Sequence, residues 1–122
     1  MNFENLYESL IENMNAQTVI HKFRKYANYI DGLWIDVTEN KREGGITLDN
    51  IDVDTNMRGA GIGSKVLSVL TNLADTYNVR IDLDMGGGDS EVDLPAWYSK
   101  HGFNWDGGKM VRYPKQNLIN NI

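Results

Sequence analysis

The stretch Ile46–Tyr77, ITLDNIDVDTNMRGAGIGSKVLSVLTNLADTY, predicts a strand, a glycine-rich turn and a helix in that order. The strand is expected over Ile46–Val53, and the helix from about Gly61 to Tyr77. A helix that starts in a glycine turn leaves its first backbone N–H groups unpaired at the positive end of the helix dipole. The stretch therefore predicts a site for a phosphate-bearing ligand. The apolar residues of the helix recur with the 3.6-residue period, at Ile62, Val66, Val69, Leu70, Leu73 and Tyr77.

The spacing of the glycines separates the known phosphate motifs. Gly59, Gly61 and Gly63 are spaced G-x-G-x-G, which does not fit the dinucleotide fingerprint G-x-G-x-x-G. The P-loop pattern G-x-x-x-x-G-K-[ST] does not fit either, because Ser64 stands between Gly63 and Lys65. The pattern that fits is R-x-x-G-x-G, at Arg58, Gly61 and Gly63. This resembles the acyl-CoA signature of the GNAT family of N-acetyltransferases.

A second segment strengthens this resemblance. Ala96–Phe103, AWYSKHGF, is similar to the Y-x-x-x-G-F block of the same family, and the two motifs follow in the family's order. The resemblance covers Leu33 to Tyr113. The chain departs from the family pattern at Thr55 and Asn56, where the family has Pro and Glu, and at Glu91, where it often has Asn.

The resemblance implies an α/β fold of the GNAT-like acyl-CoA N-acyltransferase kind. Its mixed central sheet would be splayed at the cofactor site, with helices on both faces. The family has a further strand before its first helix, and nothing before Phe3 can supply it. We therefore expect a small, reduced member of the family.

The resemblance also implies where acetyl-CoA binds as co-substrate. The pantetheine arm would pair with strand backbone near Ile51 and Val53, and the thioester oxygen would accept a hydrogen bond from a strand amide near Val53, as in an oxyanion hole. The pyrophosphate would be held by the glycine turn, whose expected cofactor-binding residues are Arg58, Gly59, Ala60, Gly61, Ile62, Gly63 and Ser64.

Tyr98 is the candidate general acid for the leaving thiolate, because the family uses a tyrosine at this place and a tyrosine hydroxyl has a pKa of about 10. The alternative is that Tyr98 only packs against Phe103. A base must also take the proton of the attacking ammonium group. The sequence leaves this choice open among four carboxylates, Glu43, Asp49, Asp52 and Asp84.

The other segments predict elements around this centre. Two amphipathic helices are expected, Phe3–Met14 and Val19–Ile30, separated by Asn15–Thr18. Val79–Met85 alternates as a half-buried strand whose acidic face, with Asp82 and Asp84, either is solvated or attracts an ammonium group. The remaining expectations are a strand Leu33–Thr38, a polar turn Glu39–Gly45, a loop Gly86–Ser90, a short helix capped by Asp93, hairpin strands Phe103–Trp105 and Lys109–Tyr113, and a frayed tail 114–122.

Composition limits the function classes. The 122 residues form one expected domain, 1–122, with 41% hydrophobic residues. Without cysteine there is no disulfide, thiolate metal site or cysteine nucleophile, so acetyl transfer would be direct or use another nucleophile. No metal site is predicted. The net charge of −5 argues against nucleic acid and favours a cationic amine. No signal peptide or membrane span is evident, and a cytoplasmic protein is expected.

The predicted function is transfer of an acetyl group from acetyl-CoA to an amine, either a protein lysine or N-terminus or a small molecule. The alternative is a GNAT-like CoA-binding module that has lost turnover and acts as a protein-interacting regulator or inhibitor. The small size, the missing first strand and the absent Asn favour this alternative, whereas the glycine turn and Tyr98 favour the enzyme. The oligomeric state stays open.

Overall fold

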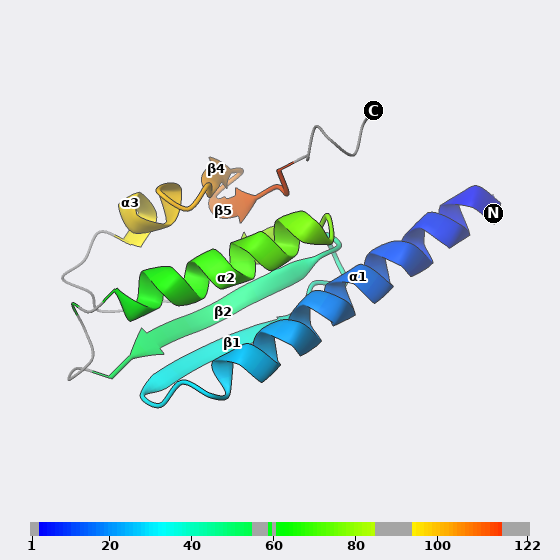
Figure 1. Ribbon diagram of the computed structural model, residues 1–122. Coiled ribbons are helices and arrows are strands. Elements are labelled where there is room, and N and C mark those ends of the chain that lie inside the picture. Colours follow the sequence, from blue (N-terminus) through cyan, green and yellow to red (C-terminus); the bar gives the residue numbers. More distant parts are fainter. Residues whose placement is uncertain (1–2, 55–58, 60, 85–93, 116–122) are drawn as a thin grey trace.

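The computed structural model describes residues 3–54, 59, 61–84 and 94–115. It forms a five-stranded sheet with the strand order β1-β2-β3-β5-β4 (Figure 1). The elements in chain order are α1 (Phe3–Ala27), β1 (Leu33–Glu39), β2 (Ile46–Val53), α2 (Ile62–Thr76), β3 (Ile81–Leu83), α3 (Leu94–Ser99), β4 (Asn104–Asp106) and β5 (Lys109–Arg112).

The sheet is mixed, as the sequence predicts. β2 and β3 are parallel, whereas the β1–β2, β3–β5 and β4–β5 pairs are antiparallel. A parallel pair needs a crossover connection, and α2 supplies it. The α/β class is therefore confirmed, and the glycine turn lies where β2 leads into α2.

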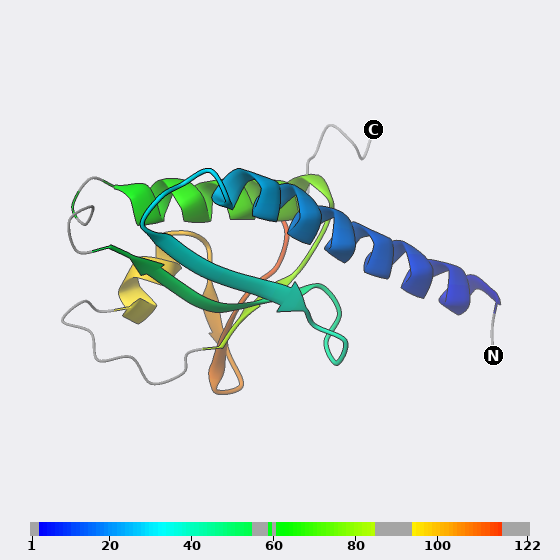
Figure 2. The same ribbon diagram turned by 90° about the horizontal axis from the view of Figure 1, so that it is seen from below.

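The two long helices share one face of the sheet. α1 contacts both α2 and β1, and α2 contacts β2. The two views agree that α1 and α2 lie side by side over the strands (Figures 1 and 2). These two helices therefore cover one face of the sheet together. The core lies beneath them and includes Val19, Phe23, Val37, Ile46, Leu48, Val66, Leu67, Leu70, Ile81 and Met110.

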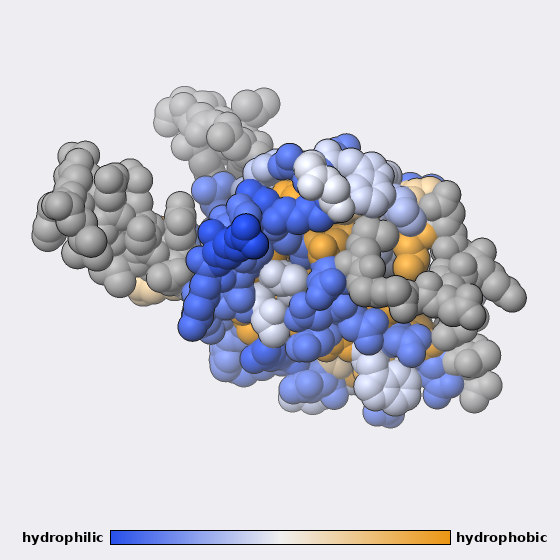
Figure 3. All heavy atoms as spheres, turned by 180° about the vertical axis from the view of Figure 1, so that it is seen from behind, coloured by the Kyte–Doolittle hydropathy of each residue, from blue (hydrophilic) through white to orange (hydrophobic). Residues whose placement is uncertain are grey.

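The opposite face of the sheet is polar, because alternate strand residues point there. It presents Thr38 and Asp49, whose side chains share a hydrogen bond of 3.0 Å, and the ion pair of Lys109 with Asp82. Figure 3 shows this side of the molecule as mostly hydrophilic with small apolar areas. A second layer of helices would have to bury these charges.

The prediction of two N-terminal helices is wrong, since Phe3–Ala27 is one helix. Ile11 and Met14, before the expected break, are 40% and 67% exposed, whereas Ala16 and Val19, after it, are buried. Within the continuous helix, the Thr18 hydroxyl donates to the carbonyl of Met14 at 2.9 Å, so its side chain bonds to the helix backbone instead of capping a second helix. The break in the apolar pattern therefore lies within a continuous helix, at the point where the described apolar side chains change from exposed to buried.

The helix after the glycine turn was predicted correctly. It is capped by Gly61 at its start and Tyr77 at its end, and Asn78 follows with a positive φ of 58°. β3 is shorter than the predicted strand Val79–Met85. In the closing hairpin, β4 is shifted by one residue from the predicted strand, and β5 starts as predicted and ends one residue earlier.

Some expectations fall outside the described residues. These are the loop Gly86–Ser90, the Asp93 cap, Met85 at the end of the predicted strand, and residues 116–122 of the tail. Among the helices that the structure describes, none is long and apolar enough to cross a membrane.

Candidate functional site

The glycine turn has an open backbone surface. Gly59 and Gly61 adopt φ values of 88° and 77°, which glycine reaches at little cost. A Cβ built on either residue would meet no atom within 4 Å. The space beside both glycines is therefore free for a ligand. Arg58 and Ala60, also expected to bind the cofactor, lie outside the described residues.

The first turn of α2 can bind an anion. Gly61 is the N-cap and has no side chain to accept from the helix, and no acidic residue lies in the first turn. The first α2 bond runs from the Lys65 N–H to the Gly61 carbonyl at 3.0 Å. The N–H groups of Ile62, Gly63 and Ser64 come before it and have no helical acceptor. Together with the helix dipole they favour negative charge at this end.

β2 carries the expected arm-binding residues Ile51 and Val53, which face β1 at Ile35 and Leu33 in the ladder. On the other side of β2, the parallel pairing with β3 runs from Ile46 to Leu48 among the described residues. It closes with the Asp84 N–H donating to the Leu48 carbonyl at 3.0 Å. The described part of β3 therefore does not reach Ile51 and Val53. Whether the strands splay there depends on residues outside the described part.

Trp97 joins the two sequence motifs in space. Its indole N–H donates to Oγ of Ser64 at 3.2 Å, which links α3 to the first turn of α2. Its ring lies 3.5 Å from the position that a Cβ on Gly63 would occupy, and Val53 Cγ2 lies 3.8 Å from the same point. Sequence analysis did not include Trp97 in the site, although its position directly before Tyr98 could have indicated that it belongs there.

Tyr98 belongs to the core through its ring. The side chain is 7% exposed, and its ring meets Phe103 edge-on with centroids 5.5 Å apart. The predicted packing against Phe103 is therefore confirmed. Burial raises the pKa of the Tyr98 hydroxyl above its ordinary value, so the group stays protonated at neutral pH. Its role as a general acid stays a prediction.

The candidate bases differ in their surroundings. Asp49 accepts the hydrogen bond from Thr38, while Asp52 and Asp84 are exposed at their strand ends. Glu43 lies 3.7 Å from Arg80 and 3.5 Å from Lys109. The choice among these carboxylates stays a prediction.

Asp82 does not lie on a solvated acidic face. It is buried, and it accepts from Arg80 Nε at 2.6 Å and from Lys109 Nζ at 2.9 Å. Burial alone would raise the pKa of Asp82, but the hydrogen bonds and charges of Arg80 and Lys109 outweigh it and lower the pKa. The alternation of the strand could not reveal that two cations of this chain satisfy the carboxylate.

His101 is half-buried rather than solvated. Its ring lies 5.4 Å from the Trp97 ring, and burial, assisted by the charge of Arg112, lowers the pKa of the imidazole. His21 is exposed. Among the residues that the structure describes, no three His, Asp or Glu side chains gather as a metal site would require.

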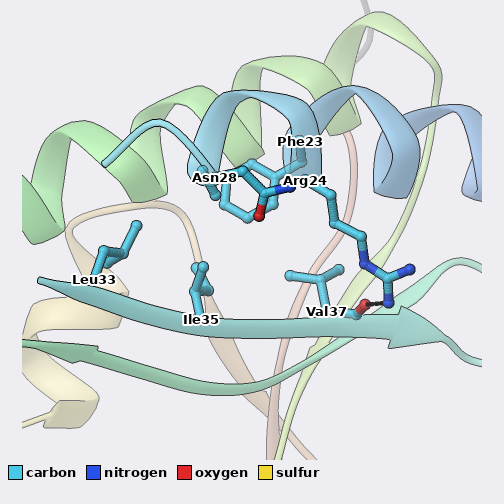
Figure 4. A pocket seen from close by; sticks show the side chains of 7 residues that line it. Phe23, Arg24, Asn28, Leu33, Ile35 and Val37 are labelled. Carbon is cyan, nitrogen blue, oxygen red and sulfur yellow. Dashed lines mark hydrogen bonds between the residues drawn. The ribbon is translucent and has the colours of Figure 1, made fainter. Parts of the chain in front are cut away.

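A small hollow of about 80 Å³ lies between α1 and β1, away from both motifs (Figure 4). Phe23, Ala27 and Val37 line it, and Arg24 closes one side by donating to the Val37 carbonyl at 2.9 Å. It is too small for a cofactor.

Comparison with known proteins identifies a fold neighbour and no family. No family model matches the chain, and no curated protein matches it either. The crystal structure of PH1933 from Pyrococcus horikoshii OT3 is similar, with a TM-score of 0.54 and 24% sequence identity. The similarity covers 68% of this chain and 58% of that one, so this chain spans under two thirds of its neighbour's length. The chain therefore shares its α/β fold with PH1933 over that part.

Proposed function

We propose that this chain is an N-acyltransferase that moves the acetyl group of acetyl-CoA directly to an amine. The observation that carries the proposal is the hydrogen bond between Trp97 and Ser64, which brings the Y-x-x-x-G-F segment against the glycine turn. Two motifs that resemble one family in sequence thus meet in space, although 33 residues separate these two positions. Independent motifs of unrelated origin have no reason to do so.

The geometry of the glycine turn supports phosphate binding. The N–H groups of Ile62, Gly63 and Ser64 would hold the pyrophosphate, and the free space beside Gly59 and Gly61 leaves room for it. No carboxylate in the first turn of α2 competes for these donors. The absence of cysteine supports direct transfer to the amine.

In the proposed reaction, the neutral amine attacks the thioester carbon, the new N–C bond forms and the C–S bond breaks. The Tyr98 hydroxyl would give its proton to the leaving sulfur, and one of the candidate carboxylates would take the proton that the amine loses, directly or through water. The Tyr98 hydroxyl is protonated at neutral pH, as this role requires, although burial raises its pKa and makes it a weaker acid.

A CoA-binding module without turnover is the second candidate, and Trp97 favours it. The indole ring lies against Gly63 and close to Val53, between the phosphate site and the strand that would hold the pantetheine arm. In this second candidate, the Trp97 ring would hinder the acyl group on its way to Tyr98, so that CoA binds without transfer. Such a module would act through a partner protein.

The test is turnover by the full chain with acetyl-CoA and a panel of amines, including alkylamines, lysine peptides and protein N-termini. Release of the free CoA thiol and the mass of the acetylated product are measured together. We expect the release of the CoA thiol to require an amine and to equal the amount of acetylated product. CoA binding without any acetylated product would contradict the acyltransferase and support the binding module.

A further inference from the structure

The sheet ends at β1, and the outer edge of this strand is open. β1 stands first in the order β1-β2-β3-β5-β4, so among the described strands it pairs with β2 alone. Figure 2 views the molecule from the side of β1, and no other described strand or helix runs along this edge in the plane of the sheet. An open edge presents backbone groups on which a further strand can pair.

The backbone hydrogen bonds show which residues of β1 point outward. The Asp54 N–H donates to the Gly32 carbonyl at 2.7 Å, so the backbone of Gly32 faces β2. In an antiparallel pair every second residue faces the partner strand in this way, which assigns Trp34 to the β2 side. The intervening residues, Leu33 and Ile35, therefore direct their N–H and C=O groups away from β2.

Val37 confirms this direction at the other end of the edge. Its carbonyl accepts a hydrogen bond of 2.9 Å from the guanidinium of Arg24 on α1 (Figure 4). A side chain of this chain thus stands where a further strand would place a donor. Among the described residues, no such donor reaches the carbonyls of Leu33 and Ile35. The edge therefore offers the backbone groups of these two residues to a partner strand.

The hollow of about 80 Å³ between α1 and β1 lies on the helix side of this edge (Figure 4). Leu33 and Ile35 line it from β1 and are half-buried, and Ala27 lines it from α1 and is half-buried too, so solvent reaches the hollow. A cavity of about 150 Å³ holds benzene, so this hollow has room for a smaller group such as a valine side chain. Partner residues opposite Leu33 and Ile35 would share their face and point toward it.

The other face of β1 favours a different kind of side chain. Trp34 is 60% exposed, and Asp36 is exposed without a paired cation in the described part of the chain. Partner residues opposite these two would lie beside a carboxylate and an exposed indole ring, which together favour a cation. On the helix side, the positive charge of Arg24 disfavours one.

We propose that the edge Leu33–Val37 binds an extended segment of a partner protein as an added antiparallel strand, in which apolar and basic residues alternate. The apolar residues would face α1 at the hollow, and the basic residues would face Trp34 and Asp36. In this mode the backbone hydrogen bonds give affinity and the alternate side chains give specificity. A second copy of this chain fits less well, because it would bring a second Asp36 to the edge and carries the same net charge of −5.

The experiment is a titration of the ¹⁵N-labelled full chain with a capped peptide of alternating lysine and valine, followed by amide hydrogen exchange. It needs no acetyl-CoA, because the edge does not depend on the proposed function. In the free protein the N–H groups of Leu33 and Ile35 should exchange quickly, whereas that of Trp34, which faces β2, should be protected. The bound peptide should slow exchange at Leu33 and Ile35 by about tenfold or more.

Matched peptides test the backbone contacts. The valines would stand opposite Leu33 and Ile35, so their N–H groups are the ones that point at β1. N-methylation of the valines should therefore abolish binding, whereas N-methylation of the lysines should preserve it. A peptide with glutamate in place of lysine should bind more weakly, because Asp36 repels it. A peptide with alanine in place of valine should also bind more weakly, because the hollow stays unfilled.

Matched variants locate the site. Asp36→Asn and Trp34→Ala should each weaken binding about two- to fivefold, the range expected for an exposed ion pair or cation–π contact. Asp84→Asn and Trp105→Ala remove the same exposed groups from other strands and should leave the affinity unchanged. Ala27→Leu fills the hollow from α1 and should remove the preference for valine over alanine, provided that circular dichroism shows an intact fold.

Other results would overturn the inference. Slow exchange of Leu33 and Ile35 in the free monomer would mean that the edge is already closed. Protection that rises with protein concentration, together with a dimer in sedimentation, would make a second copy the occupant. Equal binding of the two methylated peptides would exclude an added strand. Wild-type affinity in both Asp36→Asn and Trp34→Ala, or no binding at millimolar peptide, would remove the proposed partner.

Discussion

The indole N–H of Trp97 donates a hydrogen bond to Oγ of Ser64 at 3.2 Å, across 33 positions in the chain. The contact fastens α3 to the first turn of α2, so the two family-like motifs lie next to each other. It also holds the Trp97 ring near Gly63 and Val53, where the first turn of α2 lies close to the end of β2. Ligand binding at the glycine turn and the position of Trp97 should therefore be coupled.

Trp97→Phe tests this coupling, because it removes the N–H donor and keeps an aromatic ring. The lost hydrogen bond should lower the free energy of unfolding by about 1 kcal/mol. The same variant should bind acetyl-CoA up to about fivefold more tightly, since the ring no longer has to leave a hydrogen bond to make room. Urea denaturation and calorimetry give the two values.

The control for this variant is Trp34→Phe, which changes an exposed indole on β1 and should alter neither quantity by more than about 0.5 kcal/mol. A loss of stability in Trp97→Phe with unchanged affinity for acetyl-CoA would show that Trp97 is a fixed wall and does not move on binding.

Tyr98→Phe tests the general acid. The variant keeps the ring that packs on Phe103, so the fold and the affinity for CoA should hardly change. If the hydroxyl protonates the leaving thiolate, kcat should fall by about 10²–10⁴-fold with little change in KM. Tyr113→Phe removes a hydroxyl from the surface and serves as the matched control. Full activity in Tyr98→Phe would leave the tyrosine a purely structural role.

Gly45→Ala tests the entry into β2. Gly45 has a φ of 84°, and a Cβ there would collide with the carbonyl oxygen of Arg80, which accepts from the Ile46 N–H at 2.9 Å. Gly107→Ala has a comparable φ of 61° but open space around the new methyl group, so it carries the backbone strain alone. Thermal unfolding should show a loss of about 1 kcal/mol for Gly107→Ala and a clearly larger one for Gly45→Ala. Equal losses would contradict the collision.

The buried Arg112 gives a prediction on pH. Its guanidinium binds Asp75 through two hydrogen bonds of 2.7 and 2.9 Å. Burial alone would raise the pKa of Asp75, but the hydrogen bonds and charges of Arg112 and Lys115 outweigh it and lower the pKa. A carboxyl with a lowered pKa in the folded state stabilises the protein above the unfolded pKa of about 3.9 and loses this effect as the pH falls through the folded value.

The free energy of unfolding of the wild type should therefore fall as the pH drops below about 5. Asp75→Asn leaves the Arg112 charge buried without its partner and should cost about 3 kcal/mol at pH 7, with a weaker dependence on acid pH. Asp36→Asn, an exposed control, should follow the wild-type curve. Parallel pH curves for Asp75→Asn and the wild type would contradict this account of Asp75.

The strand, turn and helix around Gly61 could be predicted from sequence because each depends on local chemistry. The period of the apolar residues sets the helix, and the glycines set the turn. The N-terminal helix could not be delimited in this way. In sequence, a change from exposed to buried apolar residues looks the same as a break between two helices. Only the structure shows that Met14, Ala16 and Val19 lie on one continuous helix.

The candidate site was predictable only as two separate motifs. Trp97 contacts Ser64, and Lys109 pairs with Asp82, through tertiary contacts that no local pattern encodes. The alternation around Asp82 correctly indicated a strand but left open whether its acidic face is solvated or attracts an ammonium group. In the structure Asp82 is buried and paired with Arg80 and Lys109.

The most direct measurement is calorimetric titration of acetyl-CoA into the wild type, Gly61→Asn and Gly61→Asp. Both side chains tolerate the left-handed backbone of Gly61, whose φ is 77°, and both would enter the open space beside it. If the pyrophosphate binds at the start of α2, the wild type binds, Gly61→Asn binds more weakly, and Gly61→Asp binds weakest because its carboxylate repels the phosphates. Equal affinities in three folded proteins, or no binding to the wild type at millimolar acetyl-CoA, would contradict the proposal.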